Sequence, residues 1–136
     1  MDPATQAAAL PRTTLRAGAV VTALPVLFLT FDTSIKLAMI QPVADSFVQL
    51  GWPVDLSVQI GLLELVCLAL YLWPRTAVLG LILLTGYLGG AVATHVRIGS
   101  PLLTHVLFPV YVALLLWIGL SLREPRLRAL VPLRGT

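Results

Sequence analysis

Charged residues are scarce in this 136-residue chain: nine basic and six acidic side chains make up only 11% of it. In contrast, 58% of the residues are hydrophobic, and the mean hydropathy is +0.95. Ordinary soluble domains do not have this composition, and apolar runs of about 18 or more residues are candidate transmembrane helices. The sequence therefore predicts an all-α integral membrane protein.

Cysteine and histidine are also scarce, and their scarcity excludes several kinds of site. Cys67 is the sole cysteine, so the chain cannot form an internal disulfide, a dithiol redox pair or a thiolate metal cluster. Asp32, Glu64, His95 and His105 carry suitable donor atoms, but they lack the Glu-x-x-His or His-x-x-x-His spacing of metal sites. We therefore predict no metal site.

Four apolar segments are long enough to cross a bilayer. They lie at residues 17–39, 56–73, 76–96 and 102–122 and predict a four-transmembrane-helix bundle over residues 17–122. An N-terminal tail (1–16) and a basic tail (123–136) flank this bundle. The first apolar run ends in Phe-Asp-Thr-Ser-Ile-Lys rather than at a small-x-small cleavage site, so we expect a retained helix and not a signal peptide.

The arginines predict the orientation of these helices. Seven of the eight lie in the tails or between the second and third segments: Arg12, Arg16, Arg75, Arg123, Arg126, Arg128 and Arg134. The positive-inside rule then places both termini in the cytoplasm (N-in/C-in). We expect a multi-pass protein of the bacterial cytoplasmic (inner) membrane. Because topology explains the net charge of +3, we expect membrane lipids and no nucleic acid as partners.

The few charged or titratable residues within or at the ends of these segments are the strongest functional signal. Asp32 and Glu64 lie inside predicted helices, whereas Lys36, His95, Arg97 and His105 lie at or near helix ends. A charge deep in a bilayer costs about 2.5–3.5 kcal/mol, so it rarely persists without a partner or a function. In the predicted orientation all six lie at similar depth. We therefore expect one buried polar site in the outer half of the bundle.

Spacing indicates which of these residues can contact one another, and their chemistry suggests their roles. Asp32 and Lys36 are four residues apart on a helix and can pair, and Tyr87 and His95 lie on one helix stripe. The predicted catalytic residues are Glu64, Asp32, His95 and His105, and the predicted ligand-binding residues are Lys36, Tyr87, Thr94 and Arg97. The formal charges of Asp32, Glu64, Lys36 and Arg97 sum to zero, which suits a low-dielectric site. In the structural alternative, Lys36 and Arg97 only reach the lipid headgroups.

Glycine and proline predict how the helices pack. Gly86 and Gly90 form a GxxxG pattern, which lets helices approach closely in lipid. We expect residues 76–96 to be the central, tightly packed helix, with this face against another helix of the same chain; a homodimer is the alternative. Pro25 and Pro109 are expected to kink their helices, and residues 42–53 to form an interfacial helix or a lid.

Several motifs together resemble those of the DoxX-like family of small four-helix membrane proteins. They include Phe31-Asp32, Gly61-Leu-Leu-Glu64, Gly86-Tyr-Leu-Gly-Gly-Ala91 and Thr94-His-Val-Arg97. The resemblance covers about residues 26–133. It implies a membrane subunit of a redox system, working with a soluble or membrane redox partner.

Three functions stay open. In the favoured one the chain is a quinone-linked or lipophilic-ligand-binding subunit with a bound quinone or lipid. His95, His105, Tyr87 and Arg97 would donate to the head group, and Glu64 or Asp32 would carry protons. Alternatively, the chain is a self-sufficient membrane enzyme that uses carboxylate and histidine acid–base chemistry on a lipophilic small molecule. In the third function it is a scaffold that recruits a partner.

Overall fold

The computed structural model describes residues 10–130, and its regular structure there is entirely helical. The elements are α1 (Arg12–Leu37), α2 (Gln41–Gln49), α3 (Leu56–Leu72), α4 (Ala77–Arg97), a π-helical turn (Leu102–Val106), α5 (Phe108–Arg123) and α6 (Pro125–Leu130). The predictions for residues 1–9 and 131–136, including Arg134, lie outside the described residues.

Three helical stretches are long and apolar enough to cross a membrane, namely α1, α4 and residues 102–123. The fourth predicted span is α3, an apolar helix of 17 residues. At a rise of about 1.5 Å per residue, α3 measures about 25 Å, somewhat less than the 30 Å of a typical hydrocarbon core. Length and composition therefore identify three candidate spans in the described chain, with α3 at the lower limit.

The helices differ from their predicted positions at two places. α1 begins at Arg12 rather than at residue 17, because its backbone hydrogen bonds continue into the polar Arg-Thr-Thr-Leu-Arg stretch. The predicted helix at residues 102–122 is interrupted close to Pro109. A π-helical turn ends at Val106, and Pro109 lies in the first turn of α5, where a missing N–H is tolerated.

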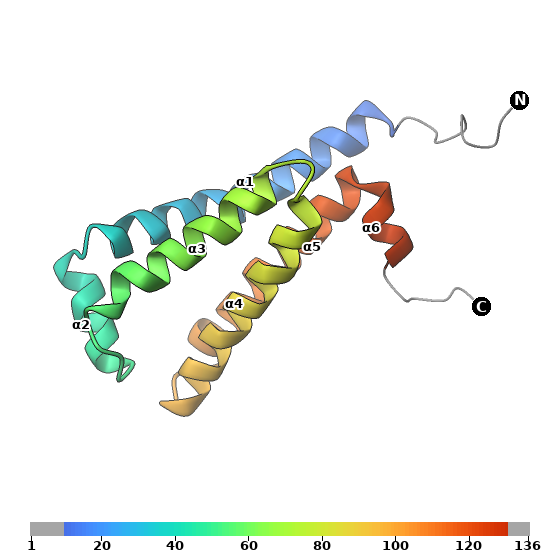
Figure 1. Cartoon of the computed structure of the whole chain (residues 1–136). Helices are drawn as coiled ribbons and strands as arrows, with labels where there is room; N and C mark the ends of the chain where they lie inside the picture. Colours follow the sequence, from blue (N-terminus) through green and yellow to red (C-terminus); the bar gives the residue numbers. More distant parts are fainter. Residues whose placement is uncertain (1–9, 131–136) are drawn as a thin grey trace, which may run out of the picture.

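The four long helices form a closed ring of neighbours. α1 and α4 each pack against both α3 and α5. Figure 1 shows that α3 and α4 diverge from the turn that joins them, and that α2 lies at the wide end of this arrangement. The short helix α6 packs back on α5 and buries Leu127. The bundle is thus closely packed at one end and open at the other.

Small residues produce the close packing at the narrow end. A Cβ atom at Gly80 of α4 would lie 2.1 Å from the backbone nitrogen of Tyr71 in α3. Likewise, a Cβ atom at Gly119 of α5 would lie 2.1 Å from Oγ1 of Thr22 in α1. The Tyr71 hydroxyl donates to the Leu116 carbonyl at 3.0 Å, which joins α3 to α5. These contacts surround a leucine-rich core that includes Leu29, Leu81, Leu84 and Leu116.

The predicted close packing of Gly86 and Gly90 within the chain is wrong. A Cβ atom at either position would meet no heavy atom within 4 Å. The physical reason is that α4 diverges from α3. The two helices are in contact at Gly80, and residues farther along α4 lie away from α3. Gly86 and Gly90 instead line a cavity.

The outward surface of the bundle is apolar. On α1, for example, Val20 and Leu27 are 71% and 69% exposed, and α3 and α4 expose several further aliphatic side chains. In water such a surface would cause aggregation, whereas in a bilayer lipid tails cover it at little cost. The surface is therefore that of an integral membrane protein.

Candidate functional site

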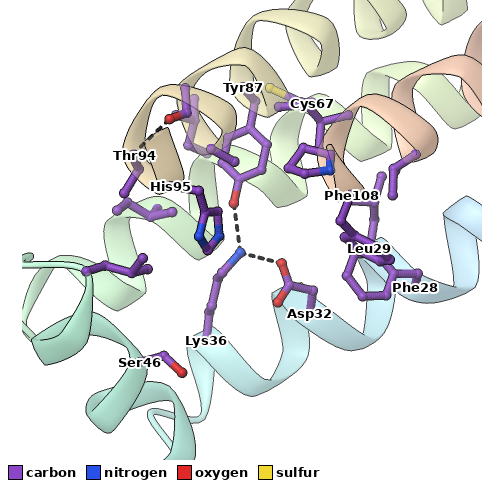
Figure 2. A pocket seen from close by; sticks show the side chains of 18 of the residues that line it. Phe28, Leu29, Asp32, Lys36, Ser46, Cys67, Tyr87, Thr94, His95 and Phe108 are labelled. Atoms are coloured by element: carbon purple, nitrogen blue, oxygen red, sulfur yellow. Dashed lines mark hydrogen bonds and ion pairs between the residues drawn. The ribbon is translucent and has the colours of Figure 1, made fainter. Parts of the chain in front are cut away.

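Four polar side chains form a hydrogen-bonded cluster that joins three helices. Lys36 of α1 donates to Asp32 on its own helix, to Glu64 Oε2 of α3 at 2.8 Å and to the Tyr87 hydroxyl of α4 at 2.8 Å. The Tyr87 hydroxyl in turn donates to Glu64 Oε2 at 2.9 Å. Figure 2 shows Lys36 bridging Asp32 and Tyr87. The cluster connects α1, α3 and α4 where the bundle widens.

Small residues on one face of α3 allow this cluster to form. Ser57, Gly61 and Glu64 lie on one side of α3 and are all buried. A Cβ atom at Gly61 would lie 3.1 Å from Lys36 Cβ, and the Ser57 hydroxyl donates to the Lys36 carbonyl at 2.9 Å. The glycine therefore lets α3 approach α1 closely enough for Glu64 to reach Lys36. This contact was not predicted from the sequence, although Ser57 and Gly61 are small residues four positions apart on one helix face.

Burial differs sharply within the cluster. The side chain of Glu64 is 0% exposed, whereas those of Lys36 and Asp32 are 13% and 26% exposed. Glu64 Oε1 is buried and has no hydrogen-bond partner among residues 10–130. Such an unpartnered oxygen is costly in a low-dielectric interior. Glu64 is therefore the member of the cluster that most depends on Lys36 and Tyr87.

The predicted neutral set of four charges does not assemble. Arg97 donates to the Leu50 carbonyl at the end of α2 and lies against Gly51. It is the last residue of α4 and lies beside the C-terminal end of α2, where free carbonyl groups attract a cation. Lys36, Asp32 and Glu64 alone carry a formal charge of −1.

A cavity of about 800 Å³ lies beside the cluster. Its size falls within the range of about 300–1,000 Å³ typical of small-molecule sites. Aromatic side chains from five parts of the chain contribute to its wall, namely Phe28, Phe47, Trp52, Tyr87 and Phe108. α2 contributes to the wall through Val43, Ser46 and Phe47, so this nine-residue helix lies over part of the cavity.

The predicted site residues divide into three groups. Those that line the cavity are Asp32, Lys36, Tyr87, Thr94 and His95, all of which are labelled in Figure 2. Glu64 does not line it. His105 lines a smaller neighbouring hollow of about 420 Å³, to which His95 also contributes. Arg97 lines neither.

The expectation of one cavity lined by both carboxylates and both histidines is therefore wrong for Glu64 and His105. Glu64 is fully covered by its neighbours, and His105 lies on the π-helical turn outside the main cavity. The two histidines are nevertheless close, with ring centroids 5.7 Å apart. His95 Nδ1 is 3.0 Å from the Ser100 hydroxyl, which fixes the ring at the boundary between the two hollows. Residues 10–130 contain no cluster of three or more acidic, histidine or cysteine side chains suited to a metal ion.

Comparison with known proteins places this arrangement in a family. A family model described as the DoxX-like family matches residues 20–119, which include the whole cluster and all the residues that line the cavity. No curated protein and no solved structure matches the chain.

Proposed function

Because this chain belongs to the DoxX-like family and is an integral membrane protein, we propose that it binds a lipophilic small molecule in the cavity between α1, α3, α4 and α5. The observation that carries the proposal is a cavity of about 800 Å³ whose wall is mostly apolar and aromatic, with a charged cluster at one side. Apolar walls with a few fixed polar groups are typical of small-molecule sites. The ligand class that fits is an apolar molecule with one polar head.

A quinone is the ligand we favour, as part of a quinone-linked membrane subunit of a redox system. Its ring would pack on aromatic side chains such as Phe28 and Phe108, while its polar groups would face Asp32, Lys36 and His95. Since Cys67 is the sole cysteine, no dithiol within this chain can exchange electrons with such a ligand. We therefore propose a soluble or membrane redox partner.

Topology forms the second part of the proposal. We propose four spans, including α3, with both termini in the cytoplasm of the bacterial inner membrane and the cavity in the outer half of the bundle. The distribution of arginine supports this: Arg12, Arg16, Arg75 and Arg123 belong to the narrow end, and Arg97 belongs to the wide end. α3 is 17 residues long, and local bilayer thinning accommodates a short helix at modest cost.

Thiol labelling tests this orientation. The native Cys67 is buried, so an introduced cysteine gives the main signal. Val48→Cys on α2, a position that is 68% exposed, should react with a membrane-impermeant maleimide in intact cells. Arg75→Cys should react only after the membrane is opened. The reverse pattern would place the cavity in the cytoplasmic half.

Ligand binding tests the function, and two adjacent glycines provide a matched pair of variants. Gly90 lines the cavity, whereas its neighbour Gly89 does not, and both have open space around them. We expect the purified full chain to bind a benzoquinone with a decyl tail, measured by calorimetry in detergent. Gly90→Leu should weaken this binding by about tenfold or more, because a leucine side chain occupies cavity space, and a factor of ten corresponds to about 1.4 kcal/mol. Gly89→Leu should leave it unchanged. Equal affinity in both variants would contradict binding in this cavity.

A further inference from the structure

Most hydrogen-bond donors on the cavity wall are already used by the protein. Lys36 has three N–H groups and directs them to Asp32, Glu64 and Tyr87. The Tyr87 hydroxyl donates to Glu64. The hydroxyl of Thr94 donates to the Gly90 carbonyl at 2.9 Å, and that of Ser46 donates to the Pro42 carbonyl at 2.8 Å. A bound molecule therefore finds none of these hydrogens free.

Acceptor positions, by contrast, remain open on the same wall. Asp32 bonds Lys36 through Oδ2, and no donor from residues 10–130 is bonded to its Oδ1. A hydroxyl oxygen that donates its hydrogen keeps lone pairs for accepting, so Thr94 and Ser46 can each accept from a ligand. His95 Nε2 accepts when Nδ1 carries the proton and donates to the Ser100 hydroxyl. Among the described residues that line the cavity, the side-chain donors left are His95 in its other tautomer, the Trp52 indole and the weakly donating thiol of Cys67.

The charge of the cavity wall also favours a ligand that donates hydrogen bonds. Asp32 and Lys36 are the only ionised side chains that line the cavity among the described residues, and Glu64 lies directly behind Lys36. The three carry a formal charge of −1, which favours a positive or hydrogen-donating group beside them. Phe28 and Phe47 also line the cavity, and aromatic rings attract cations.

We infer that the polar head of the bound molecule is a hydrogen-bond donor, a hydroxyl or an ammonium group, and that it binds at Oδ1 of Asp32. This inference rests on the proposed function, since it names the head group of the ligand in the same cavity. A quinone head has only acceptor oxygens, whereas its reduced form, the hydroquinone, carries two hydroxyl donors. For the proposed ligand, the cavity therefore selects the hydroquinone.

Matched ligands test this selection. The purified full chain is titrated under anaerobic conditions with a decyl benzoquinone, with the corresponding hydroquinone and with decylamine. We expect the hydroquinone to bind about tenfold more tightly than the quinone, the ratio that a net hydrogen bond of ordinary strength gives. Decylamine should compete with the hydroquinone, because its ammonium group is a positively charged hydrogen-bond donor. Competition by the quinone but not by decylamine would contradict the inference.

The outcomes separate this inference from the proposed function. Quinone binding that equals or exceeds hydroquinone binding overturns the donor preference and leaves the cavity as a ligand site. If none of the three molecules binds, the proposed function fails and the inference fails with it.

One variant should weaken or reverse the preference for the hydroquinone over the quinone. In Asp32→Asn the amide oxygen can keep the bond from Lys36, and the amide NH₂ then replaces the free acceptor with a donor. We expect the affinity for the quinone to rise relative to that for the hydroquinone. The control is Asp45→Asn on α2, which makes the same chemical change at a residue that bonds Gln41 and does not line the cavity. An unchanged ratio in Asp32→Asn would contradict recognition by Asp32.

Discussion

Near the turn between α3 and α4, glycine brings two helix backbones into contact, whereas farther along α4 it leaves open space. Gly80 leaves no room for a side chain against Tyr71, and Gly90 of the same helix faces a cavity. Apolar packing holds the narrow end together, while the Lys36 cluster connects the helices at the wide end. Small residues in a membrane helix therefore serve either close contact or an open space between helices, depending on where neighbouring helices diverge.

The largest effect should follow from Lys36→Met at the wide end. This change leaves Asp32 and the fully buried Glu64 without their cation, and removing one partner of a buried ion pair typically costs about 3–5 kcal/mol. We expect a matching loss of stability in detergent thermal unfolding. Combining Lys36→Met with Asp32→Asn and Glu64→Leu removes all three charges and should recover most of the loss. A combined variant as unstable as Lys36→Met alone would show that charge imbalance is not the cause.

A smaller loss is expected for Glu64→Gln. The bonds from Lys36 and Tyr87 lose their charged acceptor, and hydrogen bonds to charged groups contribute about 1.5–3 kcal/mol. Hydrogen exchange should speed up in residues 30–37 and 56–64, at the wide end, and remain slow in residues 66–72. Uniform loss of protection along α3 would mean that the two ends do not behave as separate regions.

At the narrow end, Gly80→Ala should cost about 1–3 kcal/mol, the usual range for overpacking a filled interior. The added Cβ would overlap backbone atoms of Tyr71, which cannot rotate away. Thermal unfolding of the purified variant measures the loss. A variant as stable as the native chain would show that α3 and α4 are free to separate at this crossing.

The matched change Gly90→Ala should have the smallest effect. Its Cβ meets nothing within 4 Å, and alanine forms helix more readily than glycine by about 1 kcal/mol. We expect unfolding at the same temperature as the native chain or slightly above it. A loss as large as that of Gly80→Ala would indicate that another helix or a second copy covers this face.

The class of protein and part of its polar site follow from local features of the sequence. Apolar runs alone predicted a helical membrane protein, since hydrophobicity and helix formation depend on neighbouring residues in the chain. The i, i+4 spacing predicted the contact of Asp32 with Lys36 for the same reason. Glu64 stood out because a carboxylate within an apolar helix requires a partner.

Contacts between residues far apart in the chain depend on how the helices pack. Tyr87 and Glu64 join Lys36 because Gly61 lets α3 approach α1, whereas Arg97 bonds the end of α2 and leaves the cluster with a formal charge of −1. Whether Gly80 or Gly90 packs depends on the angle at which α4 leaves α3, and that angle depends on contacts along both helices at once. A local pattern cannot contain this information, because the same GxxxG spacing fits a helix contact and a cavity wall equally well.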